Sequence, residues 1–180
     1  MPSALIRRPA LLIVDMQVGL FNGPDKPYQR ERVLDNINQL IRRAHQAGAP
    51  IFAVRHTGPE GSPIAAGSPL WQLLPTLELD EQQDVLLNKA RPSCFASTDL
   101  AERLHAAQVN ELVIVGMKTQ YCIDSTCRAS GDLGFAAVLV EDAHTCMDTP
   151  VLGAKGIIAH HNATLNGPFV RLAKTAEVQF

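Results

Sequence analysis

The sequence predicts a three-layer α/β/α protein with a Rossmann-like, mostly parallel sheet of five to six strands and helices on both faces. Short, continuous apolar runs alternate with amphipathic segments along the chain. Strands that are apolar throughout are typical of parallel sheets covered on both faces. The 180 residues contain no internal repeat and no linker-like tract, so a single domain over residues 1–180 is expected.

The apolar runs that predict strands lie at 10–15, 49–55, 84–89, 111–116 and 136–142, and residues 169–174 are a short sixth candidate. Helices are expected at 30–48, 98–107, about 120–133 and 150–165. Apolar residues recur on one face of the first helix, and Gly48 ends it. Thr98 is the expected N-cap of the second helix, and Pro150 lies near the start of the last.

Residues 57–83 interrupt this alternation. The stretch is rich in glycine and proline and contains Trp71, the only tryptophan. A long ordered loop in a compact domain is often functional, and a plain surface insertion is the alternative.

The composition argues against several partners. The net charge is −2, which gives no electrostatic basis for binding nucleic acid or an anionic membrane. No apolar run approaches the roughly 20 residues of a membrane span, and the first ten residues lack the apolar region of a signal peptide. We therefore expect a cytoplasmic protein that acts on a small molecule.

The chain has four cysteines, with neither a CxxC pair nor zinc-finger spacing. Cys94, Cys127 and Cys146 are expected to be small buried residues with free thiols. Cys122 is different, because it falls in the first turn of a predicted helix that follows a buried strand. Free backbone N–H groups and the helix dipole stabilise a thiolate at such a position.

Ionisable and glycine residues follow several of the predicted strands. The strand ends carry Asp15, Arg55–His56, Lys89, Gly116–Lys118 and Asp142. In open α/β sheets, ligands bind beyond the carboxyl ends of the strands, so a site is expected at this edge.

Asp15 is the best candidate for a general base. It directly follows an apolar run, and burial raises the pKa of a carboxyl group toward a useful range. A buried Lys89 ammonium would need a partner, which Asp15 could supply. Each residue also has a simpler interpretation, in which Asp15 caps a turn and Lys89 reaches solvent.

The histidines offer no obvious partner for Cys122. His45 and His105 are expected on helix surfaces, and His160 and His161 close the last predicted helix.

Four blocks of sequence occur in an order that resembles the isochorismatase-like cysteine hydrolase superfamily. They are "LLIVDMQVGLF", "NKARPSCF", "GMKTQYC" and "LVEDAHTCMD", and the resemblance runs from about Ala10 to Leu165. It implies that Cys122 is a nucleophile, Asp15 a general base and Lys89 a stabilising cation. It also implies a cis peptide between Met117 and Lys118, with the backbone N–H groups of Lys118 and Cys122 forming an oxyanion hole.

Two segments indicate which subgroup of the superfamily the chain resembles. Nicotinamidases of this superfamily have a metal cluster that starts with Asp-x-His, but Val54 replaces the Asp and only His56 is present. No metal and no other cofactor is therefore expected. "GSPLWQLLP" resembles a segment of a metal-free subgroup that includes streptothricin hydrolase-like amidases.

Isochorismatases proper lack the cysteine. The presence of Cys122 therefore favours hydrolysis of an amide, carbamoyl or related C–N bond through a thioester. The candidate substrate contacts, each of which could equally be a packing residue, are Gln17, Phe21, His56, Trp71 and Tyr121. Because members commonly form dimers or larger assemblies, a homo-oligomer is expected.

A second hypothesis is a non-catalytic ligand-binding protein or a thiol redox sensor on the same fold. A sensor needs a resolving thiol but no acid at a strand end. Cys127 lies five residues after Cys122 and would point away from it on a helix. The combination of Asp15 and Lys89 therefore favours the hydrolase.

Overall fold

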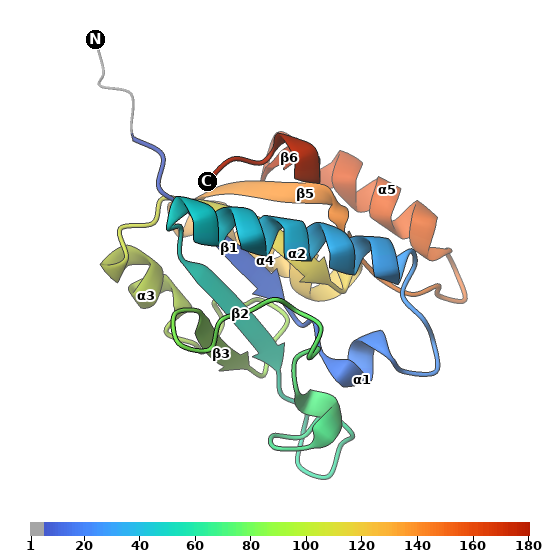
Figure 1. Cartoon of the computed structure of the whole chain (residues 1–180). Helices are drawn as coiled ribbons and strands as arrows, with labels where there is room; N and C mark the ends of the chain where they lie inside the picture. Colours follow the sequence, from blue (N-terminus) through green and yellow to red (C-terminus); the bar gives the residue numbers. More distant parts are fainter. Residues whose placement is uncertain (1–5) are drawn as a thin grey trace.

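The computed structural model describes residues 6–180 and contains one six-stranded, all-parallel sheet with the order β3-β2-β1-β4-β5-β6 (Figure 1). The strands are β1 Pro9–Val14, β2 Ile51–His56, β3 Val85–Lys89, β4 Glu111–Met117, β5 Ala136–Thr145 and β6 Arg171–Ala173. The predicted fold class is confirmed. Residues 1–5 of the predicted domain lie outside the described part.

Helices cover both faces of the sheet (Figure 1). The helices of the chain are α1 Val18–Phe21, which lies beyond the end of β1, α2 Arg30–Ala47, α3 Leu100–Ala106, α4 Asp124–Asp132 and α5 Ala154–Leu165. The alternating side chains of β1 divide between two cores. Leu11 and Ile13 join the core under α2, and Leu12 and Val14 join the core under α3 and α4. Strands buried on both faces explain the continuous apolar runs.

The long helix α2 forms as its sequence pattern predicts. Its buried apolar positions are spaced at three and four residues: Val33, Ile37, Leu40, Ile41 and Ala44. Gly48 follows in the left-handed conformation, and its N–H bonds back to Ala44 and His45.

Two predicted helix starts are wrong. Asp99, not Thr98, is the residue that precedes α3, and its side chain makes no capping bond. The Thr98 hydroxyl lies one residue earlier, where it accepts the Leu100 N–H at 3.4 Å and donates to the Cys94 carbonyl at 2.6 Å. The last helix starts at Ala154 instead of Pro150. The Asp148 carboxylate accepts the Ala154 N–H at 2.7 Å, which fixes the first turn there.

The fifth strand runs three residues further than predicted, to Thr145. Asp142 consequently lies within β5, and Oδ1 of its carboxylate accepts the N–H and the hydroxyl of Thr175 at 2.8 and 2.7 Å. It is not at the strand end, where the sequence placed it. His144 and Thr145 occupy that end instead.

The carboxyl ends of β1 and β4 approach each other very closely. Gly116 of β4 pairs with Val14 of β1 and has φ +118°. A Cβ atom at Gly116 would lie 2.1 Å from the Val14 carbonyl oxygen, so only glycine permits this approach. The strand order reverses between β1 and β4, and in this topology a crevice for ligands opens at that point.

The second half of the 57–83 loop is anchored to the core and is not a plain surface insertion. The Leu74 N–H donates to the Met16 carbonyl and the Val18 N–H donates to the Gln72 carbonyl, both at 2.9 Å. Leu74 and Leu77 are buried in the core under α2. Within residues 6–180, no helix has both the length and the hydropathy to cross a membrane.

Candidate active site

Asp15 is a buried acid at the end of β1. Its φ of 52° is in the left-handed region, which Asp tolerates better than most residues. Its N–H bonds to the Val54 carbonyl at 2.9 Å, which continues the pairing with β2. The residue is 1% exposed. Oδ2 accepts a hydrogen bond from Lys89 at 2.8 Å, whereas Oδ1 has no partner among the described residues.

The Lys89 ammonium lies at the centre of the site. Lys89 is the last residue of β3, and its side chain is fully buried. Nζ lies 2.8 Å from Asp15 Oδ2, 3.1 Å from His56 Nδ1 and 3.2 Å from Cys122 Sγ. An ammonium has three protons and accepts no hydrogen bonds, so each proton has one acceptor.

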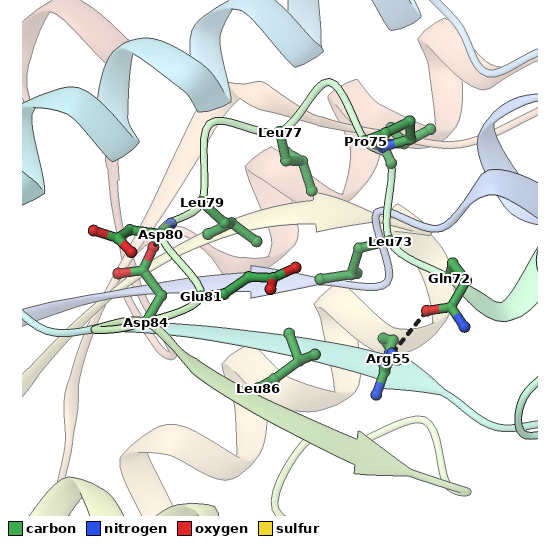
Figure 2. A pocket seen from close by; sticks show the side chains of 11 residues that line it. Arg55, Gln72, Leu73, Pro75, Leu77, Leu79, Asp80, Glu81, Asp84 and Leu86 are labelled. Atoms are coloured by element: carbon green, nitrogen blue, oxygen red, sulfur yellow. Dashed lines mark hydrogen bonds between the residues drawn. The ribbon is translucent and has the colours of Figure 1, made fainter.

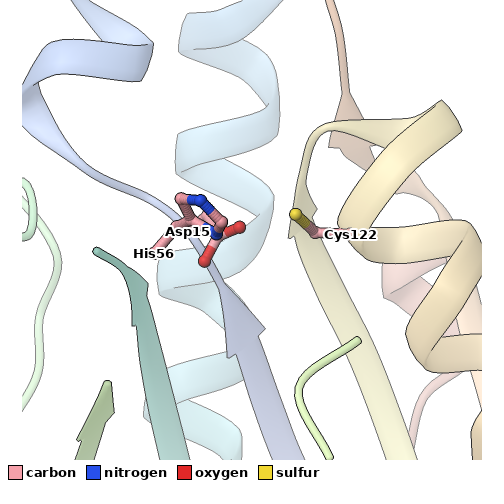
Figure 3. Close-up of side chains that lie close together, drawn as sticks. All are labelled: Asp15, His56 and Cys122. Carbon is pink, nitrogen blue, oxygen red and sulfur yellow. The ribbon is translucent and has the colours of Figure 1, made fainter. Parts of the chain in front are cut away.

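Cys122 is positioned by a π-helical turn, Thr119–Ile123, that follows β4 directly and continues into α4. The carbonyl of Lys118 accepts the N–H groups of Tyr121 and Ile123 at 3.1 and 3.3 Å. The Met117–Lys118 peptide bond is cis, as the resemblance implies. The sulfur is turned toward Asp15 and His56 (Figure 3).

The surroundings of Cys122 keep it protonated. Burial, reinforced by the Asp15 carboxylate, raises the pKa of its thiol to about 12, and Lys89 only partly opposes this. The helix start favours a thiolate, but loss of water outweighs this effect, so the resting form is the thiol. A base is needed to activate the sulfur.

The charges of the other two groups follow from the same burial. Burial raises the pKa of Asp15 above its usual value, against the stabilising charge of Lys89. Burial acts to lower the pKa of Lys89, but the negative charge of Asp15 opposes it, and this pKa is raised. Lys89 thus remains cationic. The raised pKa of Asp15 makes its carboxylate a better proton acceptor, as a general base requires.

Asp15, His56 and Cys122 each offer one potential metal-ligand atom, and these atoms lie within 4.8 Å of one another. The Lys89 ammonium contacts all three residues. The Lys89 ammonium therefore lies among the three atoms that could otherwise bind a metal ion.

A small cavity of about 230 Å³ opens onto the thiol. It is lined by Asp15, Leu20, His56, Pro92, Lys118, Tyr121 and Cys122. A neighbouring hollow of about 300 Å³ shares Leu20, Lys118 and Tyr121 with it. Tyr121 is 55% exposed, so it stands where the two cavities meet solvent.

Two of the five predicted substrate contacts, His56 and Tyr121, line this cavity, and the other three do not. The Gln17 amide is used inside the protein, where it bonds the backbone of His56 and of Trp71. The Trp71 indole donates to the Thr57 hydroxyl at 3.0 Å, and Phe21 is 6% exposed. These three side chains are therefore engaged inside the protein or buried, away from the cavity lining.

A buried chain of hydrogen bonds beneath the Cys122 turn was not predicted. His144 Nδ1 lies 2.9 Å from the Thr119 hydroxyl, and His144 Nε2 lies 2.8 Å from Asn162 Oδ1. The Asn162 oxygen only accepts, so the ring carries its proton on Nε2 and Thr119 donates to Nδ1. Thr119 lies in the block "GMKTQYC" and His144 in "LVEDAHTCMD". Their place in these two blocks was the only indication in the sequence that they belong to the site.

A larger hollow of about 670 Å³ lies away from the thiol (Figure 2). It is lined by Arg55, Gln72, Leu73, Leu74, Pro75, Leu77, Leu79, Asp80, Glu81, Asp84 and Leu86. Arg55 donates to Gln72 at 3.1 Å across its rim. None of the predicted catalytic or substrate-contact residues lines it.

The fold and the site define an α/β enzyme whose reactive groups gather at the switch point of a parallel sheet. Residues 9–155 match the isochorismatase domain family, and the chain belongs to this family of hydrolases.

Known proteins support this assignment. A streptothricin hydrolase of Streptomyces noursei is 35% identical over 141 residues, which cover 78% of this chain and 51% of that protein. A second streptothricin hydrolase of this species is 33% identical and is covered over 60% of its length. The chain thus spans little more than half of these relatives.

Two further comparisons cover more of the other protein. A ureidoacrylate amidohydrolase of Acinetobacter baylyi is 27% identical, over 74% of this chain and 69% of that protein. The solved structure of an isochorismatase from Pseudomonas putida has a TM-score of 0.88 at 29% identity, over 99% of this chain and 93% of that one.

Proposed function

We propose that the protein is a cysteine-dependent hydrolase that cleaves an amide, carbamoyl or related C–N bond through a thioester. One observation carries the proposal: the buried Lys89 ammonium contacts both the Asp15 carboxylate and the Cys122 sulfur at the wall of a cavity. The similarity to an amidohydrolase and to streptothricin hydrolases supports this reaction class.

Acylation starts from the neutral thiol. The free Oδ1 of Asp15 takes the thiol proton as Sγ bonds to the carbonyl carbon. Asp15 becomes neutral while the sulfur brings negative charge to the carbonyl oxygen, so the charge of the site is unchanged and Lys89 remains its counter-ion. Backbone N–H groups of Lys118 and Cys122, at the start of the helical turn, are the proposed donors to that oxygen.

The tetrahedral intermediate then collapses. Asp15 passes its proton to the nitrogen of the leaving group, the C–N bond breaks and the thioester forms. A water molecule next attacks the thioester carbon and gives a proton to Asp15. The carbon–sulfur bond breaks, the acid product leaves, and the sulfur recovers its proton from Asp15.

The size of the cavity bears on the substrate. At about 230 Å³ it lies below the usual range for drug-sized ligands. We propose that it holds a small acyl or carbamoyl group, with the rest of the substrate extending past Tyr121 into the neighbouring hollow.

A screen of amides, lactams and N-carbamoyl compounds for release of amine or ammonia tests the proposal, with Cys122→Ala as the control. Hydroxylamine should trap the thioester as a hydroxamate in the native protein alone. Turnover that survives in Cys122→Ala would exclude the covalent mechanism.

The thiol redox sensor is less well supported. Cys127, its candidate resolving thiol, is fully buried, and burial raises the pKa of that thiol. A disulfide between the two residues would need an accessible and reactive partner for Cys122.

Four further expectations belong to the same proposal. The enzyme works without a metal, so dialysis against a chelator should leave both activity and melting temperature unchanged. Residues 1–180 form one hydrolase domain, which acts in the cytoplasm. It assembles as a homo-oligomer, which light scattering on the purified chain would test; a monomer at micromolar concentration would contradict this.

A further inference from the structure

The imidazole of His56 is the third acceptor of the Lys89 ammonium, at 3.1 Å from Nδ1 to Nζ. We infer that His56 is a positioning residue that fixes Lys89 between the acid and the nucleophile. The effect of His56 on catalysis rests on the proposed function. The contact between His56 and Lys89 does not depend on it.

The contact determines the state of the His56 ring. An ammonium can only donate, so Nδ1 must be unprotonated and the proton of the neutral ring lies on Nε2. Three groups face the ring: Lys89, Asp15 and Cys122. The adjacent Arg55 is directed to Asn88, Gln72 and the Trp71 ring instead. A protonated ring would turn an N–H toward the ammonium and add a second cation.

The backbone of His56 is held by the side chain of Gln17, which does not line the cavity. Oε1 of Gln17 accepts the His56 N–H at 2.8 Å, and Nε2 of Gln17 donates to the His56 carbonyl at 3.0 Å. Gln17 itself is fully buried and also bonds the Trp71 carbonyl at 2.8 Å. The position from which the ring reaches Lys89 is therefore set by the end of β2 together with the segment after β1.

Removal of the Nδ1 acceptor would leave one N–H of a buried ammonium without a partner, which is a costly arrangement. The side chain of Lys89 would move toward other acceptors and weaken its contacts to Asp15 Oδ2 and Cys122 Sγ. His56 thus acts through Lys89 on the reactivity of the thiol, although it also borders the substrate cavity.

Two variants of the full chain test the inference without any substrate. His56→Asn places an amide oxygen near the position of Nδ1, whereas His56→Phe keeps a ring of similar size without an acceptor. Iodoacetamide is the probe. In its reaction Sγ bonds to the CH2 carbon, iodide leaves and the thiol proton is taken by Asp15. Cys122 is the expected target, because the other three cysteines are buried, and mass spectrometry identifies the modified residue.

We expect His56→Phe to lower the alkylation rate at pH 7.5 on the order of tenfold, as loss of a hydrogen bond to a charged donor predicts. His56→Asn should stay within about threefold of the native rate, and circular dichroism should show both variants folded at the assay temperature. Equal rates in His56→Phe and the native protein would overturn the inference. An alkylation rate in His56→Asn as low as that in His56→Phe would also overturn it. Only a role as hydrogen-bond acceptor, and not a purely structural role, predicts that Asn restores the rate.

Nitrogen NMR of the imidazole provides a second readout. The inference requires the Nε2–H tautomer in the native protein and a changed Nδ1 shift in Lys89→Met, and a protonated Nδ1 at neutral pH would contradict it. Neither experiment depends on turnover. If the hydrolase assignment fails, these results still stand, and if they fail, the Cys122→Ala comparison still tests the hydrolase.

Discussion

The buried His144 should make the stability of the protein depend on pH in a defined window. The ring is 2% exposed and joins Thr119 to Asn162. Burial lowers its pKa to about 4, against an ordinary value of 6.5. The folded protein therefore holds this histidine neutral at pH values where the unfolded chain already binds a proton.

The sign and size follow from linkage. A folded-state pKa below the unfolded value gives a contribution that is fully present above pH 6.5. This contribution disappears as the pH falls from 6.5 to about 4. The difference corresponds to about 3 kcal/mol, at about 1.4 kcal/mol for each pH unit. The free energy of unfolding should thus fall by about 3 kcal/mol between pH 6.5 and 4 because of His144 alone, in addition to the effect of other groups.

Urea unfolding of the native protein and of His144→Gln, measured between pH 7.5 and 4, isolates the effect. Gln can keep the donor to Asn162 but does not titrate. The variant should be less stable at pH 7.5 and show a flatter pH dependence, so the gap between the two proteins narrows by about 3 kcal/mol. The same change at the exposed His160 controls for the substitution itself. Parallel curves for the native protein and His144→Gln would refute the argument.

Three further predictions concern the site and the strand contact beneath it. Cys122→Ala should lower turnover by at least about a thousandfold, since the nucleophile is lost, while the free energy of unfolding changes little; retained turnover would exclude Cys122 as nucleophile. Lys89→Met should destabilise the protein by about 3–5 kcal/mol in urea unfolding, because Asp15 is left buried without its partner. The double variant with Asp15→Asn should regain stability but not turnover, and no regain would mean that the pair is not coupled. Gly116→Ala should prevent stable folding, because its Cβ would lie 2.1 Å from the Val14 carbonyl oxygen, and circular dichroism of a folded, native-like variant would contradict this.

Much of the architecture could be predicted from local patterns. The continuous apolar runs indicated a parallel sheet, and the spacing of apolar residues located α2 together with its glycine end. The C-terminal end of β5 and the start of α5 could not be predicted in this way. Asp142 lies inside β5, where it contacts Thr175, 33 residues further along the chain. The first turn of α5 is fixed by the Asp148 carboxylate, which accepts the Ala154 N–H and could not be told from other polar residues of this segment by pattern alone.

The candidate site shows the same division. The sequence blocks singled out Asp15, Lys89 and Cys122 as residues that follow or end strands. They did not indicate that His56 contacts Lys89 or that Gln17 is consumed by backbone contacts. The helix start indicated stabilisation of a thiolate at Cys122, but burial has the larger effect and keeps the thiol protonated.

The sequence by itself determined the class of fold, the order of its elements and the residue types available at the strand ends, because these depend on periodicity and on neighbours along the chain. The tertiary structure alone decided which of these side chains meet. Strand order brings residues 15, 89 and 122 to one crevice, and exclusion of water there sets their protonation, which no local pattern of residues encodes.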